Sequence, residues 1–366
     1  MIILTYIVCI LYVSLIVIFM VGWRKTSVRP CNQTRNDTNG VSVIIPVRNE
    51  AKNLPKLLFA LQNQTFQDFE IVFIDDHSSD NSQEILSNFA KSRKNTCIIA
   101  AVGLGKKNAL REGIASTGSP TELLICTDAD CIPNKNWVEA IAAFYAESRA
   151  DLIIAPVVML GDKSVFQQMQ ALEFLSLQAA TAGAACAGMP IMCNGANMAF
   201  PRKTWLAHNA NLKDDKLSGD DMFLLMSVKR AKGNIACLKS ENAVVFAFPC
   251  RTMGDFFNQR KRWVSKSTGY TDFFVILTAF AVFGISAMTI ASAIWGILYG
   301  SWLLFAFIFL VKLLSDRILL YTYGKFAKST HLLKWLLPLS LIYPFYIVLT
   351  AFFGLFGKFV WKGREK

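Results

Sequence analysis

The chain has 366 residues, of which 53% are hydrophobic and 17% are charged, and its mean hydropathy is +0.37. This composition is too apolar for an ordinary water-soluble protein, so we expect part of the chain to lie in a membrane. The formal net charge of +12 fits basic residues that face anionic lipid head groups. No basic module is interleaved with aromatic residues, so nucleic acid is not an expected partner.

Cysteine and histidine usage argues against a soft-metal site. The 9 cysteines include no C-x-x-C pair, so neither a disulfide framework nor a zinc site is expected. The histidines, His77, His208 and His331, are too few and too scattered for a histidine metal cage. Any bound metal should therefore be a hard cation held by carboxylates.

The chain begins with an apolar segment, residues 1–23, that is long enough to span a membrane. It lacks a basic n-region and a small-residue cleavage site, so it predicts a retained transmembrane anchor instead of a signal peptide. Arg24, Lys25 and Arg29 follow it, and the positive-inside rule places them in the cytosol. Residues 24–40 are polar and rich in Asn, which predicts a linker.

Residues 41–270 have the mixed composition of a globular domain. Val41–Val47 is a β-branched run typical of a buried parallel strand, and a helical stretch follows over residues 53–64. Further strand signals lie at Glu70–Ile74, Thr96–Ala101, Leu123–Cys126 and Leu152–Val158, and helical signals at Asn81–Ala90, Lys106–Ala115 and Asn136–Ala146. This alternation predicts a doubly wound, Rossmann-like α/β sheet, whose ligands bind beyond the carboxyl ends of the strands.

Residues 271–366 are again apolar and predict a membrane bundle with two to three transmembrane helices. Two of these are expected within Phe273–Leu298 and Trp302–Tyr323, and a third apolar stretch runs from Leu332 to Phe356. The domain organisation predicted from the sequence is therefore anchor, linker, globular domain and membrane bundle.

Two features of this bundle allow more than one interpretation. Lys312 and Asp316 form an i,i+4 pair that could be buried within the bundle or sit at the membrane interface, and we favour the interface. Pro338 and Pro344 could break the last apolar stretch into a re-entrant or interfacial hairpin, which would return the basic C-terminus to the cytosol.

The strongest local pattern is the pair of carboxylates Asp128 and Asp130, which flank one small residue at the end of an apolar strand. Such a pair can hold Mg²⁺ or Mn²⁺ against a diphosphate and so neutralise the charge that grows on the leaving phosphate. Alone, the same pattern is more often a helix cap or a solvated loop.

Other charged clusters each have two interpretations. Asp75–Asp76 could cap the next helix or bind a nucleobase or ribose. Gly103–Lys107 lacks the Walker spacing but could place a lysine on a diphosphate. Ser218–Asp221 could start a capped helix or supply a general base. Gln259–Trp263 could be a group of basic and aromatic residues at the membrane interface, or could bind a phosphate and stack on a sugar.

Together these clusters resemble the family 2 glycosyltransferases over residues 41–270. The motifs that carry the resemblance are VSVIIPVRNE, IDDHSSDNS, GLGKKNALREGI, LLICTDADC, CNGANMAF, SGDDMFLL and QRKRW. Within that family the chain is similar to membrane-bound members with D, DxD, DD and QxxRW motifs, which include ceramide glucosyltransferases and polysaccharide synthases. The resemblance implies a GT-A fold and a multi-pass protein of the cell (inner) membrane, with its catalytic domain in the cytosol.

The resemblance also implies roles for individual residues. The nucleotide-sugar, expected to be a UDP-sugar, would be bound by Pro46, Glu50, Asp76, Lys106 and Asp128. Asp128 and Asp130 would hold Mg²⁺ or Mn²⁺. The catalytic residues would be Asp221 as the general base, Asp220 to position it, Arg262 on the phosphates, Trp263 near the acceptor, and Gln259 as the first residue of the same motif.

The expected reaction is an inverting transfer of one sugar to a membrane lipid, which is a step of glycolipid synthesis. The alternative is a processive synthase of an extracellular polysaccharide. Such a synthase needs a transmembrane channel for the growing chain, and three or four apolar segments are few for building one. The segment from Phe166 to Ala187 predicts a helix that could pack in the core or lie at the membrane interface and admit a lipid. The oligomeric state stays open.

Overall fold

The computed structural model describes residues 2–29, 40–118, 121–161, 164–213, 219–356, 360–361 and 364–365. The chain divides into two compact units. The sheet unit comprises Ser27–Val158 and Met192–Phe248, and the helical unit comprises Met1–Thr26, Met159–Ile191 and Pro249–Lys366. Each unit thus combines segments that are distant in the sequence. The predicted domains, by contrast, are continuous stretches of the chain, and their boundaries stay predictions.

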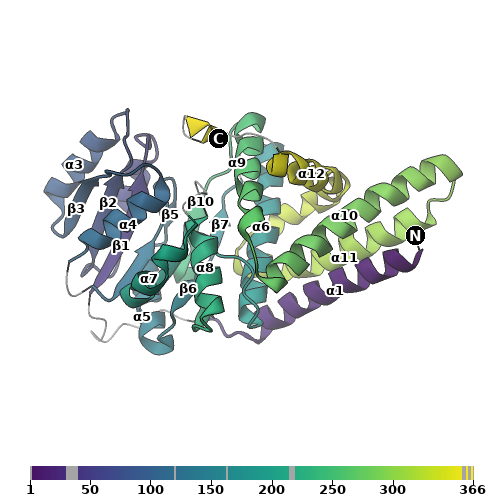
Figure 1. Ribbon diagram of the computed structural model, residues 1–366, viewed down its shortest axis with the longest axis horizontal. Helices are drawn as coiled ribbons and strands as arrows, with labels where there is room; N and C mark the ends of the chain where they lie inside the picture. Colours follow the sequence, from purple (N-terminus) through teal and green to yellow (C-terminus); the bar gives the residue numbers. More distant parts are fainter. Residues whose placement is uncertain are drawn as a thin grey trace. The chain divides into compact units, whose positions relative to one another are not determined.

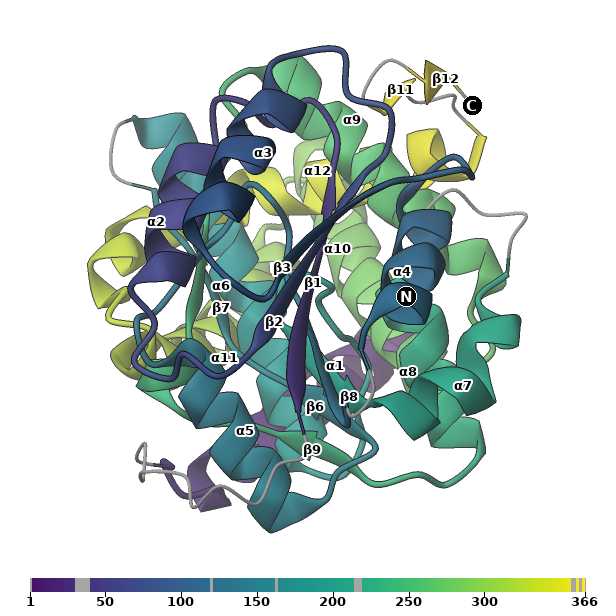
Figure 2. The same cartoon turned by 90° about the vertical axis from the view of Figure 1, so that its left-hand side faces the viewer.

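The sheet unit is built on a seven-stranded sheet with the strand order β3-β2-β1-β4-β8-β6-β9 (Figure 2). The strands are β1 (Val41–Val47), β2 (Glu70–Asp75), β3 (Thr96–Ala100), β4 (Leu123–Cys126), β6 (Leu152–Ile154), β8 (Met198–Pro201) and β9 (Ile235–Cys237). β1 pairs in parallel with β2 and β4, and β2 with β3. β8 runs antiparallel to β4 and β6. The predicted α/β sheet is confirmed, with an antiparallel strand added to it.

Helices follow most of these strands. They are α2 (Leu54–Gln62), α3 (Ser82–Ser92), α4 (Lys106–Ser116), α5 (Trp137–Ser148), α7 (Arg202–His208) and α8 (Asp220–Arg230). A three-stranded sheet has the order β5 (Ile132–Pro133), β10 (Val245–Ala247) and β7 (Val157–Met159). Short 3-10 turns lie at Asn209–Asn211, Glu241–Ala243, Ser267–Gly269 and Thr330–Trp335, and a C-terminal hairpin pairs β11 (Val360–Trp361) with β12 (Arg364–Glu365).

The register of the parallel strands brings their carboxyl ends to one edge. Val47 lies beside Asp75, and Asp75 lies beside Ala100. Ile44 of β1 lies beside Cys126, the last residue of β4. Nearly all side chains of β1, β2 and β4 are buried, as expected for strands covered on both faces, whereas β3 at the end of the sheet is only half-buried. The polar residues that follow these four strands therefore gather at one edge of the sheet.

The helical unit contains α1 (Ile2–Lys25), α6 (Val165–Cys186), α9 (Met253–Ser265), α10 (Phe273–Tyr299), α11 (Leu303–Phe326) and α12 (Leu336–Phe356). α1, α10 and α11 lie side by side (Figure 1). α1 also packs closely on α6, because a Cβ atom added at Gly22 would lie 2.6 Å from the carbonyl oxygen of Gly183. Small residues let two helix backbones approach in this way.

Within the residues that the structure describes, three helical segments are long and apolar enough to cross a membrane, namely Ile2–Lys25, Phe273–Tyr299 and Thr330–Gly354. They match the span predicted at the N-terminus, the span predicted within Phe273–Leu298 and the third apolar stretch, Leu332–Phe356. The span expected within Trp302–Tyr323 corresponds to α11, which is not among these three segments of the described chain. α12 continues through Pro344 as one helix, so the proposed break at this residue is wrong. Pro338 lies in the first turn of α12, where a helix needs no N–H donor.

Lys312 and Asp316 form an ion pair on α11. Lys312 is 4% exposed, and its Nζ lies 4.9 Å from the centroid of the Tyr343 ring on α12. The hydroxyl of Tyr12 on α1 donates to Oδ1 of Asp316 at 2.5 Å. The pair is thus buried among three helices of the bundle, and our preference for a position at the interface is not supported.

Candidate active site

The loops that follow β1 and β2 are joined by hydrogen bonds at the sheet edge. The Asn49 N–H donates to Oγ of Ser78 at 3.0 Å, and Oδ1 of Asn49 accepts from the Ser79 N–H at 2.7 Å. The Ala51 N–H donates to Oδ2 of Asp80 at 3.0 Å. Asn49 has a left-handed backbone with φ of 52°, a conformation that Asn tolerates better than most residues. The two loops therefore form one polar platform.

Glu50 and Asp80 are held within this platform. The Glu50 N–H donates to Oγ of Ser82 at 2.9 Å, and Oε2 of Glu50 accepts from Nδ2 of Asn53 at 2.6 Å. Burial works to raise the pKa of Asp80, but hydrogen bonds from Ser82 and from the Ala51 N–H lower it below its usual value. Glu50 itself is 7% exposed, so its carboxylate has a fixed position.

Asp76 connects the end of β2 to the start of α4. It is 2% exposed, and both of its carboxylate oxygens lie 3.2 Å from the Gly105 nitrogen, whose N–H donates to them. Nη1 of Arg48 donates to the Asp76 carbonyl oxygen at 2.8 Å. Gly105 has φ of 91°, a conformation that favours glycine. Asp76 thus holds the turn that precedes Lys106, the first residue of α4.

Lys106 lies among the carboxylates of the site. Its Nζ donates to Oδ1 of Asp128 at 2.6 Å and lies 3.9 Å from Oδ2 of Asp220. Burial alone would lower the pKa of Lys106, but the charges of Asp128, Asp220 and Asp221 raise it above its usual value. The ammonium group therefore stays charged across the physiological range of pH.

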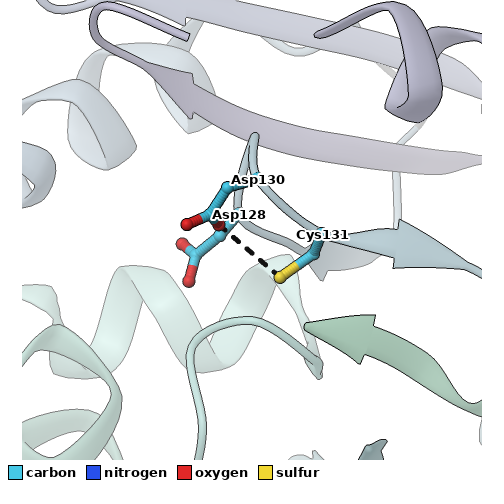
Figure 3. Close-up of side chains that lie close together, drawn as sticks. All are labelled: Asp128, Asp130 and Cys131. Atoms are coloured by element: carbon cyan, nitrogen blue, oxygen red, sulfur yellow. Dashed lines mark hydrogen bonds between the residues drawn. The ribbon is translucent and has the colours of Figure 1, made fainter. Parts of the chain in front are cut away.

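Asp128 and Asp130 lie side by side after β4, and the thiol of Cys131 points toward them (Figure 3). One ligand atom from each of these three residues lies within 4.8 Å of the others. Sγ of Cys131 donates to Oδ1 of Asp130 at 3.6 Å, and burial raises the pKa of this thiol well above its usual value. Two carboxylates beside a neutral thiol fit a hard divalent cation.

The pair Asp220 and Asp221 begins α8, directly after Gly219, whose φ is 102°. Asp220 is 3% exposed, whereas Asp221 is half-buried. Oδ2 of Asp221 accepts from the Gly195 N–H at 3.2 Å, and Oδ1 accepts from the Met222 N–H at 2.8 Å. Asp221 is therefore the more accessible carboxylate of the pair.

Gly195 is a site residue whose role the sequence did not reveal. A Cβ atom added there would lie 3.1 Å from Nζ of Lys106 and 3.5 Å from Oδ2 of Asp220. The loop after Asn194 therefore lies against both the lysine and the acidic pair. Its only sequence signal was its place in the CNGANMAF motif.

Lys107 is a second residue that sequence reasoning missed. It is 5% exposed, and its Nζ donates to the carbonyl oxygens of Leu212 at 2.5 Å and Lys213 at 2.6 Å. The same nitrogen lies 4.8 Å from the centroid of the Phe223 ring on α8. Lys107 thus connects the start of α4 to the chain that leads toward α8. Ser218, in the predicted motif before Asp220, lies outside the described residues.

The structure places the remaining predicted residues as follows. Pro46 lies in β1 opposite Ile74. Gln259, Arg262 and Trp263 lie on α9 of the helical unit and are half-buried. The sheet unit therefore brings together Lys106, Asp128, Asp130, Asp220 and Asp221, while the helical unit holds the three residues of the Q-x-x-R-W motif.

Comparisons with known proteins agree with this arrangement. The sequence profile of glycosyl transferase family 2 matches residues 42–207. A poly-beta-1,6-N-acetyl-D-glucosamine synthase of Staphylococcus epidermidis is 27% identical over 139 residues, which is 38% of this chain and 33% of that protein. An undecaprenyl-phosphate 4-deoxy-4-formamido-L-arabinose transferase of Serratia proteamaculans is 38% identical over 96 residues, 25% of this chain and 28% of that protein.

The chain spans 28% to 38% of the length of the curated relatives it matches. A solved structure is similar over nearly the whole chain. The mannosyltransferase PcManGT from Pyrobaculum calidifontis, in complex with GDP-Man and Mn²⁺, has a TM-score of 0.62 and 17% sequence identity, covering 96% of this chain and 99% of that one. This likeness confirms the predicted GT-A fold. Residues 42–207 are a glycosyl transferase family 2 domain.

Proposed function

We propose that this protein transfers a sugar from a nucleotide-sugar to a membrane lipid, with inversion at the anomeric carbon. The observation that carries the proposal is the position of Lys106, whose ammonium group contacts Asp128 and lies 3.9 Å from Asp220. A lysine and two pairs of carboxylates at the carboxyl end of a parallel sheet suit a diphosphate, a divalent cation and a proton acceptor.

The donor would lie on the platform after β1 and β2. Glu50 and Asp76 offer fixed carboxylates for the ribose or the base, and Pro46 lies in the adjoining strand. Lys106 would contact the diphosphate. We expect UDP as the nucleotide, and because the structural relative PcManGT holds GDP-Man, GDP-sugars belong in the same test.

Asp128 and Asp130 would hold the metal, and the presence of Mn²⁺ in the PcManGT structure supports a divalent cation. Once bound, such an ion would neutralise negative charge on the departing diphosphate. The carboxylates themselves would fix its position, since Asp130 accepts from Cys131 and Asp128 from Lys106.

Asp221 is the proposed general base. It would take the proton from the acceptor hydroxyl as that oxygen attacks the anomeric carbon and the bond to the diphosphate oxygen breaks. Hydrogen bonds from the Gly195 and Met222 N–H groups orient its two oxygens. Asp220, which is buried beside Lys106, would position Asp221. Attack from the face opposite the leaving group inverts the anomeric centre.

A lipid acceptor is supported by three apolar helices and by the relative named for an undecaprenyl-phosphate substrate. The second candidate is synthesis of an extracellular polysaccharide, which the relative named poly-beta-1,6-N-acetyl-D-glucosamine synthase favours. We further propose that the sheet unit faces the cytosol, because Arg24, Lys25 and Arg29 follow the first span.

The test is to incubate the purified protein with a panel of radiolabelled UDP- and GDP-sugars and a membrane lipid extract. We expect label in a lipid fraction that grows by one sugar per acceptor. Label in a high-molecular-weight polymer would support the polysaccharide synthase instead. No transfer from any donor, while an Asp221→Asn control behaves identically, would contradict both candidates.

A further inference from the structure

A buried cation lies inside the Q-x-x-R-W motif, at a position that the motif leaves unspecified. Arg260 on α9 is 3% exposed, and its Nε donates to Oε1 of Glu173 on α6 at 3.2 Å, while its Nη2 donates to Oε2. Glu173 is 5% exposed and also accepts from the hydroxyl of Tyr346 on α12 at 3.2 Å. Three side chains thus connect three helices of the helical unit.

The same guanidinium contacts both ends of the motif. Nη1 of Arg260 donates to Oε1 of Gln259, and Cζ of Arg260 lies 4.1 Å from the centroid of the Trp263 ring. A guanidinium can only donate hydrogen bonds, so Gln259 must turn its carbonyl oxygen toward Arg260 and keep its NH₂ group as a donor for other partners. A cation over the indole face likewise favours one orientation of Trp263.

The helices around this network are closely joined. One turn before Glu173, Gln170 donates to the Cys250 carbonyl oxygen and accepts from the Cys250 N–H, both at 3.0 Å. At the other end of α9, a Cβ atom added at Gly354 of α12 would lie 2.4 Å from Cβ of Val264. α9 is therefore held at its start by α6 and at its end by α12, and Arg260 lies between these contacts.

We propose that Glu173 and Arg260 are positioning residues, which set the orientation of Gln259 and Trp263 for sugar transfer. This inference rests on the proposed function, and on the further proposal that Gln259 and Trp263 contact the substrates, as the resemblance of the Q-x-x-R-W motif implies. A buried ion pair is often replaceable by apolar side chains without loss of stability. Apolar side chains, however, supply neither a donor for Gln259 nor a cation over Trp263.

The first test uses the double variant Glu173→Leu, Arg260→Met, which removes both charges together and so leaves no unpaired ion. Its matched control is Lys312→Met, Asp316→Leu, which removes the buried ion pair of α11 in the same unit. We expect both variants to unfold near the wild-type temperature. Only the first should lose about 10²-fold in kcat, the scale expected when a reacting group is displaced by about 1 Å.

Equal losses of kcat in both double variants would overturn the inference, since any buried ion pair of the bundle would then have the same effect. Arg260→Lys keeps the charge but loses the planar guanidinium group, whose separate N–H donors reach Glu173 and Gln259 at the same time. Its kcat should fall between those of the wild type and the apolar double variant.

The second test adds the apolar double variant to Gln259→Ala, Trp263→Ala and measures single-turnover transfer. If Glu173 and Arg260 act through these two residues, the combination should be no slower than Gln259→Ala, Trp263→Ala by itself. Losses that multiply would overturn the positioning role and leave the proposed function intact. A wild-type rate in both Gln259→Ala and Trp263→Ala would instead contradict the proposed role of the motif, and the inference with it.

Discussion

The ammonium nitrogen of Lys106 lies 2.6 Å from Oδ1 of Asp128, so the first residue of α4 partly neutralises a carboxylate that follows β4. The same nitrogen is 3.9 Å from Oδ2 of Asp220 at the start of α8. One cation therefore lies between the carboxylate that we propose as a metal ligand and the pair that we propose as the proton acceptor.

Replacing Lys106 with Met should weaken the binding of a nucleoside diphosphate by about 10- to 100-fold, as expected for the loss of a charged hydrogen-bond donor. Lys106→Arg should recover part of this affinity. The control is Lys203→Met, because the Lys203 side chain is 73% exposed and lies 3.8 Å from Asp151. Calorimetric titration checks the prediction, and unchanged affinity in Lys106→Met would remove Lys106 from the donor site.

Transfer should stop in excess EDTA and return with Mn²⁺ or Mg²⁺, because Asp128 and Asp130 offer hard oxygen ligands. Asp130→Asn should also bind Mn²⁺ more weakly, as measured by electron paramagnetic resonance without any turnover. Asp151→Asn serves as the control, since this carboxylate lies outside the cluster of possible ligands. Full activity in EDTA would show that the metal assignment is wrong.

The pH dependence of stability tests the platform around Asp80. The pKa of Asp80 is lowered in the folded protein, so its charged form stabilises the fold above the unfolded pKa of about 3.9. This contribution is lost as the pH falls through the folded pKa. Asp80→Asn should therefore unfold at a lower temperature than the wild type at pH 7, and the difference should narrow below about pH 4. If the unfolding temperatures of Asp80→Asn and the wild type differ by the same amount at pH 7 and below about pH 4, the charge of Asp80 is not the source of the stabilisation.

The orientation of the sheet unit can be tested with an engineered thiol. Lys203→Cys places a cysteine at an exposed position of α7. We expect an impermeant thiol reagent to label it only after cells are opened, with the wild type as the background control. Labelling of intact cells would place the sheet unit outside.

The parallel half of the sheet could be predicted because its strands are continuous apolar runs. β1 and β2 are buried along nearly their whole length, and each precedes a helical segment. β8 is only four residues long and pairs antiparallel with both neighbours. Its existence depends on β4 and β6 as partners, and no periodicity in Met198–Pro201 indicates it.

The types of residue at the site could be predicted, but not what holds them in place. The carboxylates and Lys106 follow strand ends, and the sheet brings strand ends together. Lys107, by contrast, contacts backbone carbonyls at Leu212 and Lys213, which no local pattern encodes. The same limit applies to Arg260: in the run QRKRW, only the presence of Glu173 on α6 distinguishes this buried cation from the half-buried Lys261 and Arg262.

The assignment of Asp221 as the general base predicts a specific contrast with Asp220. Asp221→Asn keeps the size of the side chain and one of its two hydrogen bonds from backbone N–H groups, but it cannot take the acceptor's proton. Transfer should fall by about 10²- to 10⁴-fold, roughly 3 to 5 kcal/mol of barrier. Asp220→Asn should cost less, because Asp220 is buried beside Lys106 and would act by positioning.

The most direct test of this account is the single-turnover rate of sugar transfer by Asp221→Asn, measured beside calorimetric binding of the nucleoside diphosphate and the metal. We predict that binding stays close to that of the wild type while transfer falls by at least about 10²-fold. Transfer near the wild-type rate, or a loss of donor binding as complete as in Asp130→Asn, would contradict the role of Asp221 as the base and the mechanism built on it.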